Sequence, residues 1–128
     1  MFHYTVETNK SIEQAVTDLE ASLKEDKFGV LWDFNIQETL QKKGFEFDTP
    51  YRVLEVCNPK EAKRVLEENA LVGYFLPCKI VVYAEGEKTK IGMPKPTELI
   101  SMVGEEQLKA FAKDIEDRLI ECIDKSVK

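Results

Sequence analysis

Residues 56–62 constrain the fold more than any other segment, because they mark the end of a strand and the start of a helix. Asn58 is a favoured N-cap residue, whose side-chain oxygen accepts a hydrogen bond from an amide of the first helical turn. Pro59 then occupies the first helical position, where its missing N–H costs nothing. Glu61, three residues after Asn58, completes an arrangement similar to a capping box. We therefore expect a strand to end at Cys57 and a helix to begin at Pro59.

Two cysteines lie at the strand–helix junctions of this region, Cys57 before the N-cap and Cys78 at the start of the next apolar run. If the helix packs on the sheet, the two sulfur atoms come close together. The positive end of a helix dipole lowers the pKa of a nearby thiol, which predicts a stabilised thiolate at Cys57. Glu55 shares a strand face with Cys57, so these residues and Cys78 are candidate ligands for zinc or another soft metal ion, beside Asn58. Simple packing is the alternative, since free cysteine is among the most buried residue types.

Four segments around this region together resemble a known family. They read LQKKGF at 40–45, VLEVCNPKEA at 53–62, LPC at 76–78 and VVY at 81–83. In this combination they resemble a prokaryotic family of undetermined role, domain of unknown function three hundred and two, over essentially the whole chain. The resemblance implies a β-α-β(4)-α fold, similar in outline to the repeat of the TATA-box-binding protein, and assembly as a homodimer. It implies no activity and supplies no catalytic residues.

Hydrophobic periodicity predicts the other elements. Alternation at 2–7 and 30–36 indicates half-buried strands, and apolar residues recurring at three and four positions indicate a helix capped by Ser11 and a long helix over 104–128. The helix from Pro59 is expected to bury Ala62, Val65 and Leu66. The order β, α, β, β, α, β, β, α predicts an α+β domain over residues 1–128. We expect its helices to cover one face of a single curved, mainly antiparallel sheet, with the long C-terminal helix among them.

The charge balance restricts the partners. The chain has a net charge of −6, from 24 acidic and 18 basic side chains. Nucleic-acid phosphates and anionic membrane surfaces attract basic patches, so neither partner is expected. No apolar run approaches the roughly 20 residues that cross a bilayer, and residues 1–4 lack the pattern of a signal peptide. We therefore expect a cytoplasmic protein with reduced cysteines.

The connection before Cys78 is unusually apolar for a loop. It contains Leu71, Tyr74, Phe75 and Leu76, which predict either a ligand-pocket wall or a dimer interface. Trp32, the sole tryptophan, is expected to pack in the core or to line the same pocket.

Three functions remain open, and the sequence favours a binding protein over an enzyme. No nucleotide-binding, hydrolase or metalloprotease motif is present, and His3, the only histidine, has no partner nearby in the sequence. The first function is a thiol site at Cys57 and Cys78 for a soft metal ion or a thiol-reactive small molecule. The second is an apolar-ligand carrier or sensor. The third is a dimeric structural or regulatory protein that associates through residues 71–77.

Overall fold

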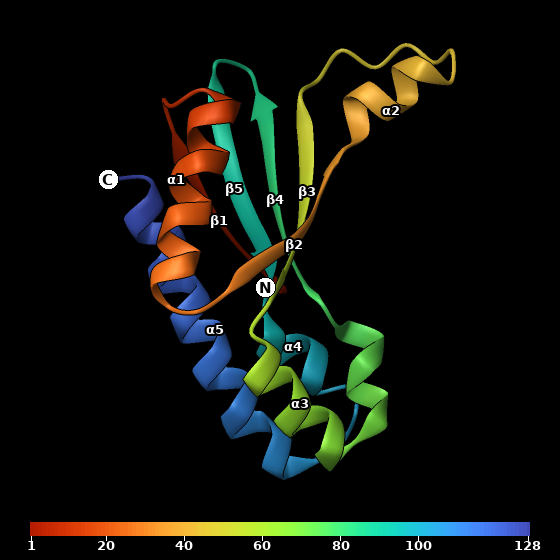
Figure 1. The fold of residues 1–128 in the computed structure, drawn as a ribbon, viewed down its shortest axis with the longest axis vertical. Coiled ribbons are helices and arrows are strands. Elements are labelled where there is room, and N and C mark those ends of the chain that lie inside the picture. The colour runs from red at the N-terminus through yellow and green to blue at the C-terminus, as the bar shows by residue number, and fades with distance from the viewer.

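Five strands form one antiparallel sheet in the computed structural model, which describes residues 1–128 (Figure 1). They lie in the order β1-β5-β4-β3-β2, so β1 and β2 are the edges and β4 is central. Their bounds are His3–Thr8 (β1), Gly29–Asn35 (β2), Tyr51–Cys57 (β3), Cys78–Glu85 (β4) and Lys88–Pro94 (β5). Every neighbouring pair is antiparallel, which confirms the predicted α+β class and sheet type.

Helices cover one face and one end of this sheet. They are Ile12–Glu25 (α1), Ile36–Lys42 (α2), Pro59–Glu68 (α3), the 3-10 helix Ala70–Phe75 (η1), Pro96–Ile100 (α4) and Glu106–Ser126 (α5). In Figure 1, α1 and α5 lie against the strands, whereas α3, η1 and α4 gather at one end. α2 projects from the opposite end of β2 and β3. No helix has the combination of length and apolarity needed to cross a membrane.

The main core lies between the sheet and the pair α1–α5. Alternate strand residues face the two helices, as a period of two requires. The fully buried members are Leu54 and Val56 of β3, Ile80 and Val82 of β4, Ile91 of β5, Ala15, Leu19 and Leu23 of α1, and Ile123 of α5. The helical stripes predicted for the first and last helices therefore pack on the same strand face.

The predicted helix starts are confirmed by their capping bonds. The Ser11 hydroxyl accepts a hydrogen bond from the Gln14 amide at 3.1 Å. The Asn58 side chain accepts one from the Glu61 amide at 3.2 Å. These bonds satisfy amides that have no partner within the helix. The two helix starts were thus predictable from local sequence alone.

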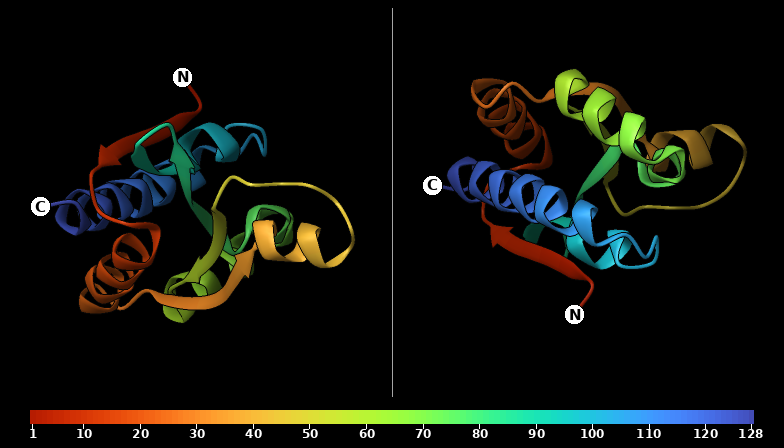
Figure 2. Two further views of the ribbon diagram at one scale, coloured as in Figure 1. Left: turned by 90° about the horizontal axis from the view of Figure 1, so that it is seen from above. Right: turned by 90° about the horizontal axis from the view of Figure 1, so that it is seen from below.

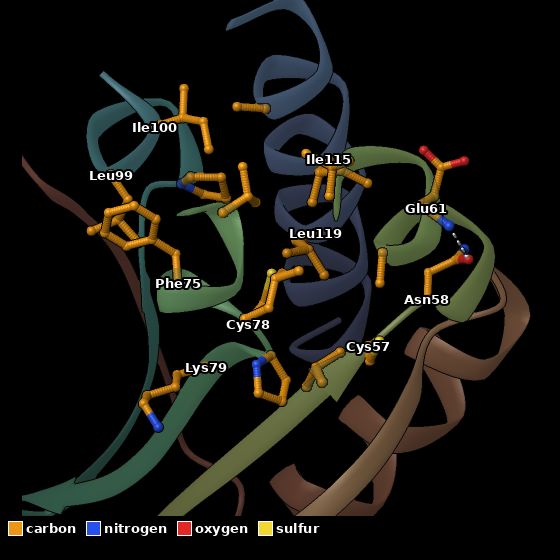
Figure 3. Close-up of a pocket in the computed structure, with 18 of the residues that line it drawn as sticks. Cys57, Asn58, Glu61, Phe75, Cys78, Lys79, Leu99, Ile100, Ile115 and Leu119 are labelled. Atoms are coloured by element: carbon orange, nitrogen blue, oxygen red, sulfur yellow. Dashed lines mark hydrogen bonds between the residues drawn. The ribbon is translucent and has the colours of Figure 1, made fainter. Parts of the chain in front are cut away.

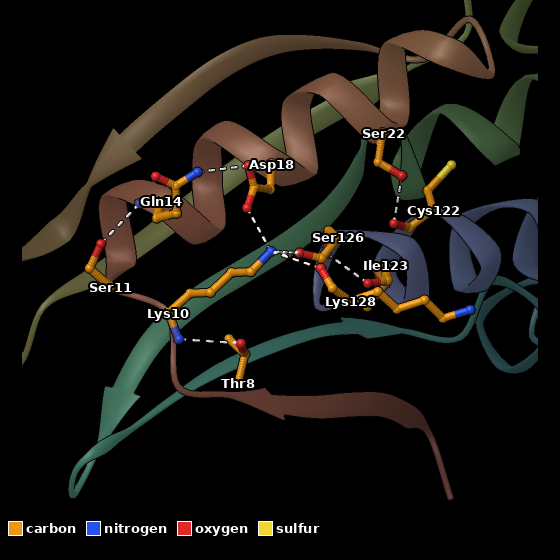
Figure 4. Close-up of polar contacts among 10 residues, drawn as sticks. All are labelled: Thr8, Lys10, Ser11, Gln14, Asp18, Ser22, Cys122, Ile123, Ser126 and Lys128. Carbon is orange, nitrogen blue, oxygen red and sulfur yellow. Dashed lines mark hydrogen bonds and ion pairs between the residues drawn. The ribbon is translucent and has the colours of Figure 1, made fainter.

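A lysine from the β1–α1 connection holds the two main helices together (Figure 4). Lys10 Nζ donates to Asp18 of α1 at 2.6 Å and to the Ser126 carbonyl of α5 at 2.7 Å. Farther along, the Ser22 hydroxyl donates to the Cys122 carbonyl at 2.7 Å. A cation at the C-terminal end of a helix also interacts favourably with the helix dipole. These contacts set the position of α5 along α1.

The register of edge strand β2 corrects one prediction. Val30 pairs with Val56, but Trp32 pairs with Glu55, so Leu31 is an extra residue in a β-bulge. Val30 therefore faces the core, whereas Trp32 is 54% exposed on the opposite face. The core location predicted for Trp32 is wrong, because period-two alternation cannot reveal an inserted residue.

Helix α3 buries less than its sequence predicted. Val65 is buried, but Leu66 is exposed and Ala62 is only half-buried. The reason is the position of α3 at the end of the sheet rather than on its face (Figure 1), where only Val65 is buried.

Candidate ligand cavity

A cavity of about 340 Å³ lies where β3 ends and β4 begins, enclosed by α3, η1, α4 and α5 (Figure 3). Of the 24 residues that line it, 17 are hydrophobic. This volume is within the range of small-molecule sites, which are concave and mostly apolar. The sheet end is therefore hollow, in contrast to the filled core beside it.

Antiparallel pairing builds the floor of the cavity. Val56 pairs with Cys78, which places the end of β3 next to the beginning of β4. The chain leaves β3 through Asn58 into α3 and enters β4 from η1 through Leu76 and Pro77. Both junctions therefore meet at one end of the sheet, as the sequence predicted, and both line the cavity.

Helix α5 forms the longest wall. Phe111, Ala112, Ile115 and Leu119 line the cavity from its N-terminal and middle turns. They belong to the same apolar stripe that continues to Ile123 in the main core. The apolar stripe of this one amphipathic helix therefore contributes side chains both to the cavity wall and to the filled core.

Two polar contacts hold the remaining walls on α5. The Glu116 carboxylate, 7% exposed, accepts hydrogen bonds from the Thr97 amide at 3.1 Å and hydroxyl at 2.7 Å, which fixes the start of α4. The Asn69 amide donates to the Glu105 carboxylate at 2.6 Å and so fixes the junction of α3 with η1. Neither pair was predicted from the sequence. A glutamate within an apolar stripe was the only available signal, and its partner is distant in sequence.

The two predicted thiols line the same cavity. Burial raises the pKa of Cys78 to about 11, with the neighbouring Cys57 as a second cause. Burial also raises the pKa of the Cys57 thiol. The predicted lowering at the helix start is therefore wrong, because desolvation by the apolar walls outweighs the helix dipole. Both thiols carry their protons at neutral pH.

The predicted three-ligand zinc site is not formed. Glu55, Cys57 and Cys78 all line the cavity, yet no group of three or more His, Cys, Asp or Glu side chains is placed to hold a metal ion. His3 lies outside the cavity on β1, where its Nδ1 is 2.9 Å from the Thr5 hydroxyl. The side-chain sulfur atoms on the cavity wall are those of the two thiols and of Met93.

The apolar connection before Cys78 divides between the cavity and the surface. Tyr74, Phe75 and Leu76 line the cavity, although Tyr74 is also 83% exposed. Leu71 is exposed and does not line it. Trp32 does not line it either, because the bulge in β2 turns this side chain to the opposite face. Of the five residues predicted to form a pocket wall or an interface, three thus lie on the wall of this cavity.

The fold and the cavity define a class: an α+β protein with one antiparallel sheet and an apolar cavity at its helix-covered end. Comparison with protein families matches residues 4–126 to "Domain of unknown function DUF302", and the chain belongs to this family. It is similar to the protein in the "Crystal structure of uncharacterized conserved protein DUF302 from Bacillus stearothermophilus", with 57% sequence identity, 98% of each chain covered and a TM-score of 0.96. No curated protein matches the chain.

Proposed function

We propose that this protein is a binding module that holds a small apolar molecule in the cavity between the sheet end and α3, η1, α4 and α5. The observation that carries this proposal is the cavity itself, about 340 Å³ with predominantly hydrophobic walls. Apolar surface exposed in such a cavity is a favourable site for a ligand that brings apolar surface of its own.

The charged residues that line the cavity are Glu55, Glu61 and Lys79, none of them buried, and its other polar groups favour a neutral ligand. The Asn58 side chain is already bonded to the Glu61 amide. The thiols of Cys57 and Cys78 have raised pKa values and are weak, neutral hydrogen-bonding groups. Protonated thiols are also poor nucleophiles, which favours binding over covalent chemistry. A compact hydrocarbon or aromatic molecule with one weakly polar end fits this arrangement.

Filling the cavity with protein tests this proposal. Ala112 is buried on the cavity wall, whereas Ala110 lies on the exposed side of the same helix. We expect Ala112→Phe to weaken binding of the neutral probe N-phenylnaphthylamine by about tenfold or more, equivalent to about 1.4 kcal/mol. Ala110→Phe is the matched control and should bind the probe as the wild type does. Fluorescence titration measures both.

Two outcomes would contradict the proposal: no probe binding by the wild type, or equal binding by Ala112→Phe. Circular dichroism establishes that each variant is folded. Ala62→Phe places a ring on the cavity wall from α3, at a half-buried position that tolerates added volume better. It should reduce binding in the same direction if Ala112→Phe does not fold.

A second candidate function is a thiol site for a soft metal ion, which is supported by the presence of Cys57 and Cys78 among the residues that line the cavity. Cys57 and Cys78 come from adjacent strand ends, and thiolates are the preferred ligands of soft ions such as Cu(I). Competition with a chromogenic Cu(I) chelator tests this function. Cys57→Ser and Cys78→Ser should each weaken binding by about tenfold or more. Cys122→Ser is the control, because Cys122 lies outside this cavity. Equal affinity in all variants would exclude the thiol site.

A further inference from the structure

The end of the molecule beyond the sheet carries most of its excess negative charge. Residues 65–77 form the end of α3 and η1, and residues 96–108 form α4 and the start of α5. Neither segment contains a lysine or an arginine, and together they contain the carboxylates Glu67, Glu68, Glu98, Glu105 and Glu106. Because the net charge of the chain is −6, these carboxylates account for nearly all of the excess. We call the surface of these two segments the acidic end.

The two segments lie side by side. Figure 2, right, shows α3, η1, α4 and the start of α5 gathered at this end. The hydrogen bond from Asn69 to Glu105 joins the segments, and the side-chain nitrogen of Gln107 is 3.4 Å from carboxylate oxygens of both Glu68 and Glu105. Buried side chains from both segments also form one small apolar cluster. The carboxylates therefore belong to one continuous part of the surface.

The cations that border the acidic end have contacts of their own. Arg64 pairs with Glu61 at 3.4 Å, and Lys109 pairs with Glu106 at 3.1 Å. The other four carboxylates of the acidic end have no ion pair within the chain. Such a surface attracts a cationic partner and accelerates its association.

The two remaining border cations lie on the sheet rather than among the helices. Lys79 is in β4, where it stands opposite Glu55 of β3. Lys95 follows β5, and its amide donates to the Phe2 carbonyl beside β1 at 2.7 Å. Neither makes an ion pair with a carboxylate of the acidic end.

Exposed apolar side chains lie among these carboxylates. Four of the nine large hydrophobic residues that are exposed belong to the acidic end: Leu66, Leu71, Tyr74 and Met102. Leu71 and Tyr74 are three residues apart in the 3-10 helix η1, so they lie on the same side of it. Leu66 of α3 lies against the neighbouring Gly73, where an added β-carbon would be 3.3 Å from the Leu66 Cδ2 atom. Leu71 and Tyr74 therefore form an apolar ridge beside α3.

Asn69 holds this ridge in place. Its side-chain oxygen accepts a hydrogen bond from the Leu71 amide at 2.9 Å, and its side-chain nitrogen donates to Glu105 at 2.6 Å. The start of η1 is thus bonded to the start of α5. A surface that is already ordered loses less conformational entropy when a partner binds.

An apolar ridge among unpaired carboxylates matches a basic amphipathic helix. The apolar stripe of such a helix would cover Leu71 and Tyr74, and its lysines or arginines would face the carboxylates. A second copy of this chain would bring carboxylates against carboxylates, which is unfavourable, and nucleic acid is itself anionic. We infer that the acidic end docks a basic amphipathic helix of another protein. This inference goes beyond the proposed function and does not depend on a molecule in the cavity.

A defined pair of peptides tests this inference. The probe is a fluorescein-labelled synthetic amphipathic helix of leucine and lysine, and the comparison peptide has glutamate in place of every lysine. Leu71 is exposed and does not line the cavity, so Leu71→Ser leaves the core and the cavity unchanged. It should weaken binding of the lysine helix by about tenfold. Leu31→Ser, at an exposed leucine of β2, is the matched control and should bind as the wild type does. Fluorescence anisotropy measures each affinity.

A charge comparison tests the same surface with different side chains. Glu67→Gln combined with Glu68→Gln should weaken binding of the lysine helix by about fivefold. Glu13→Gln combined with Glu20→Gln removes two charges from exposed positions of α1 and should leave the affinity unchanged. Equal weakening by the two pairs would show attraction to the net charge of the whole chain and would overturn the inference.

Three other results would also overturn it. The first is no binding of the lysine helix to the wild type. The second is equal binding of the glutamate helix, or of polylysine, which has no apolar stripe. The third is self-association of the wild type in light scattering that Leu71→Ser abolishes, because this would assign the surface to a second copy of the chain.

Discussion

The two ends of helix α5 have contrasting surroundings. Its C-terminal half packs with α1 on the strand face, where Leu119 and Ile123 join a filled core. Its N-terminal half faces the end of the sheet, where Ala112 belongs to a smaller cluster beside the cavity. This difference shows that the density of packing depends on whether strands lie beneath the helices. The interior is filled where the strands lie beneath α1 and α5. Beyond the ends of the strands, the short elements are held by a few polar contacts and leave a hollow.

Truncating one leucine in each region gives the largest expected contrast. Leu19 is fully buried between α1 and the sheet, so Leu19→Ala should lower the free energy of unfolding by about 3 kcal/mol. Leu76 is half-buried on the cavity wall, so Leu76→Ala enlarges an existing space and should cost about 1 kcal/mol. Urea denaturation measures both values. Equal losses would show that the cavity end is as tightly packed as the core.

Removing the carboxylate that holds α4 should loosen the cavity end selectively. Glu116→Ala leaves the Thr97 amide and hydroxyl without their partner, at a cost of about 1–2 kcal/mol. Amide hydrogen exchange should accelerate in α4 and remain slow in α1. The control is Glu121→Ala, whose side chain is exposed on the same helix. Uniform acceleration across the whole protein would contradict a local role.

The Lys10 contacts provide the corresponding test at the filled end. Lys10→Met keeps most of the aliphatic side chain but removes the bonds to Asp18 and to the Ser126 carbonyl, and should cost about 1 kcal/mol. Lys63→Met at an exposed position of α3 is the matched control and should change little. Thermal unfolding measures both. An unchanged melting temperature for Lys10→Met would show that packing alone places α5 on α1.

Cys78 makes the free energy of unfolding depend on pH only in alkaline solution. Its pKa is about 11 in the folded protein, above the ordinary thiol value of 9.0. The unfolded chain therefore loses this proton first, so the stability that the neutral thiol contributes is complete below about pH 9 and falls as the pH rises toward 11. Cys78→Ala should reduce the decline between these values, as measured by urea denaturation across pH. An identical decline in both proteins would assign the alkaline loss to other groups.

The local sequence was sufficient to predict the main helices and strands and their order, but it did not predict the register of β2. Ser11 and Asn58 were predicted to cap the starts of two helices, and each side chain accepts a hydrogen bond from the amide three residues later. The face of Trp32 was mispredicted, because the bulge at Leu31 leaves no mark in the alternation of apolar residues. The location of Cys57 and Cys78 at the same end of the sheet was predictable from the two strand–helix junctions that carry them. The direction of their pKa shifts was not, since it depends on walls contributed by distant elements.

Patterns within single segments determined that this chain forms strands and helices in this order, because capping and amphipathic periodicity act over a few residues. Only the tertiary structure decided that Glu116 would hold α4, that the sheet would end in a hollow, and that Trp32 would face away from the core. These outcomes depend on how separate segments pack together. The energies of such packing arise between residues distant in the sequence, which no local pattern records.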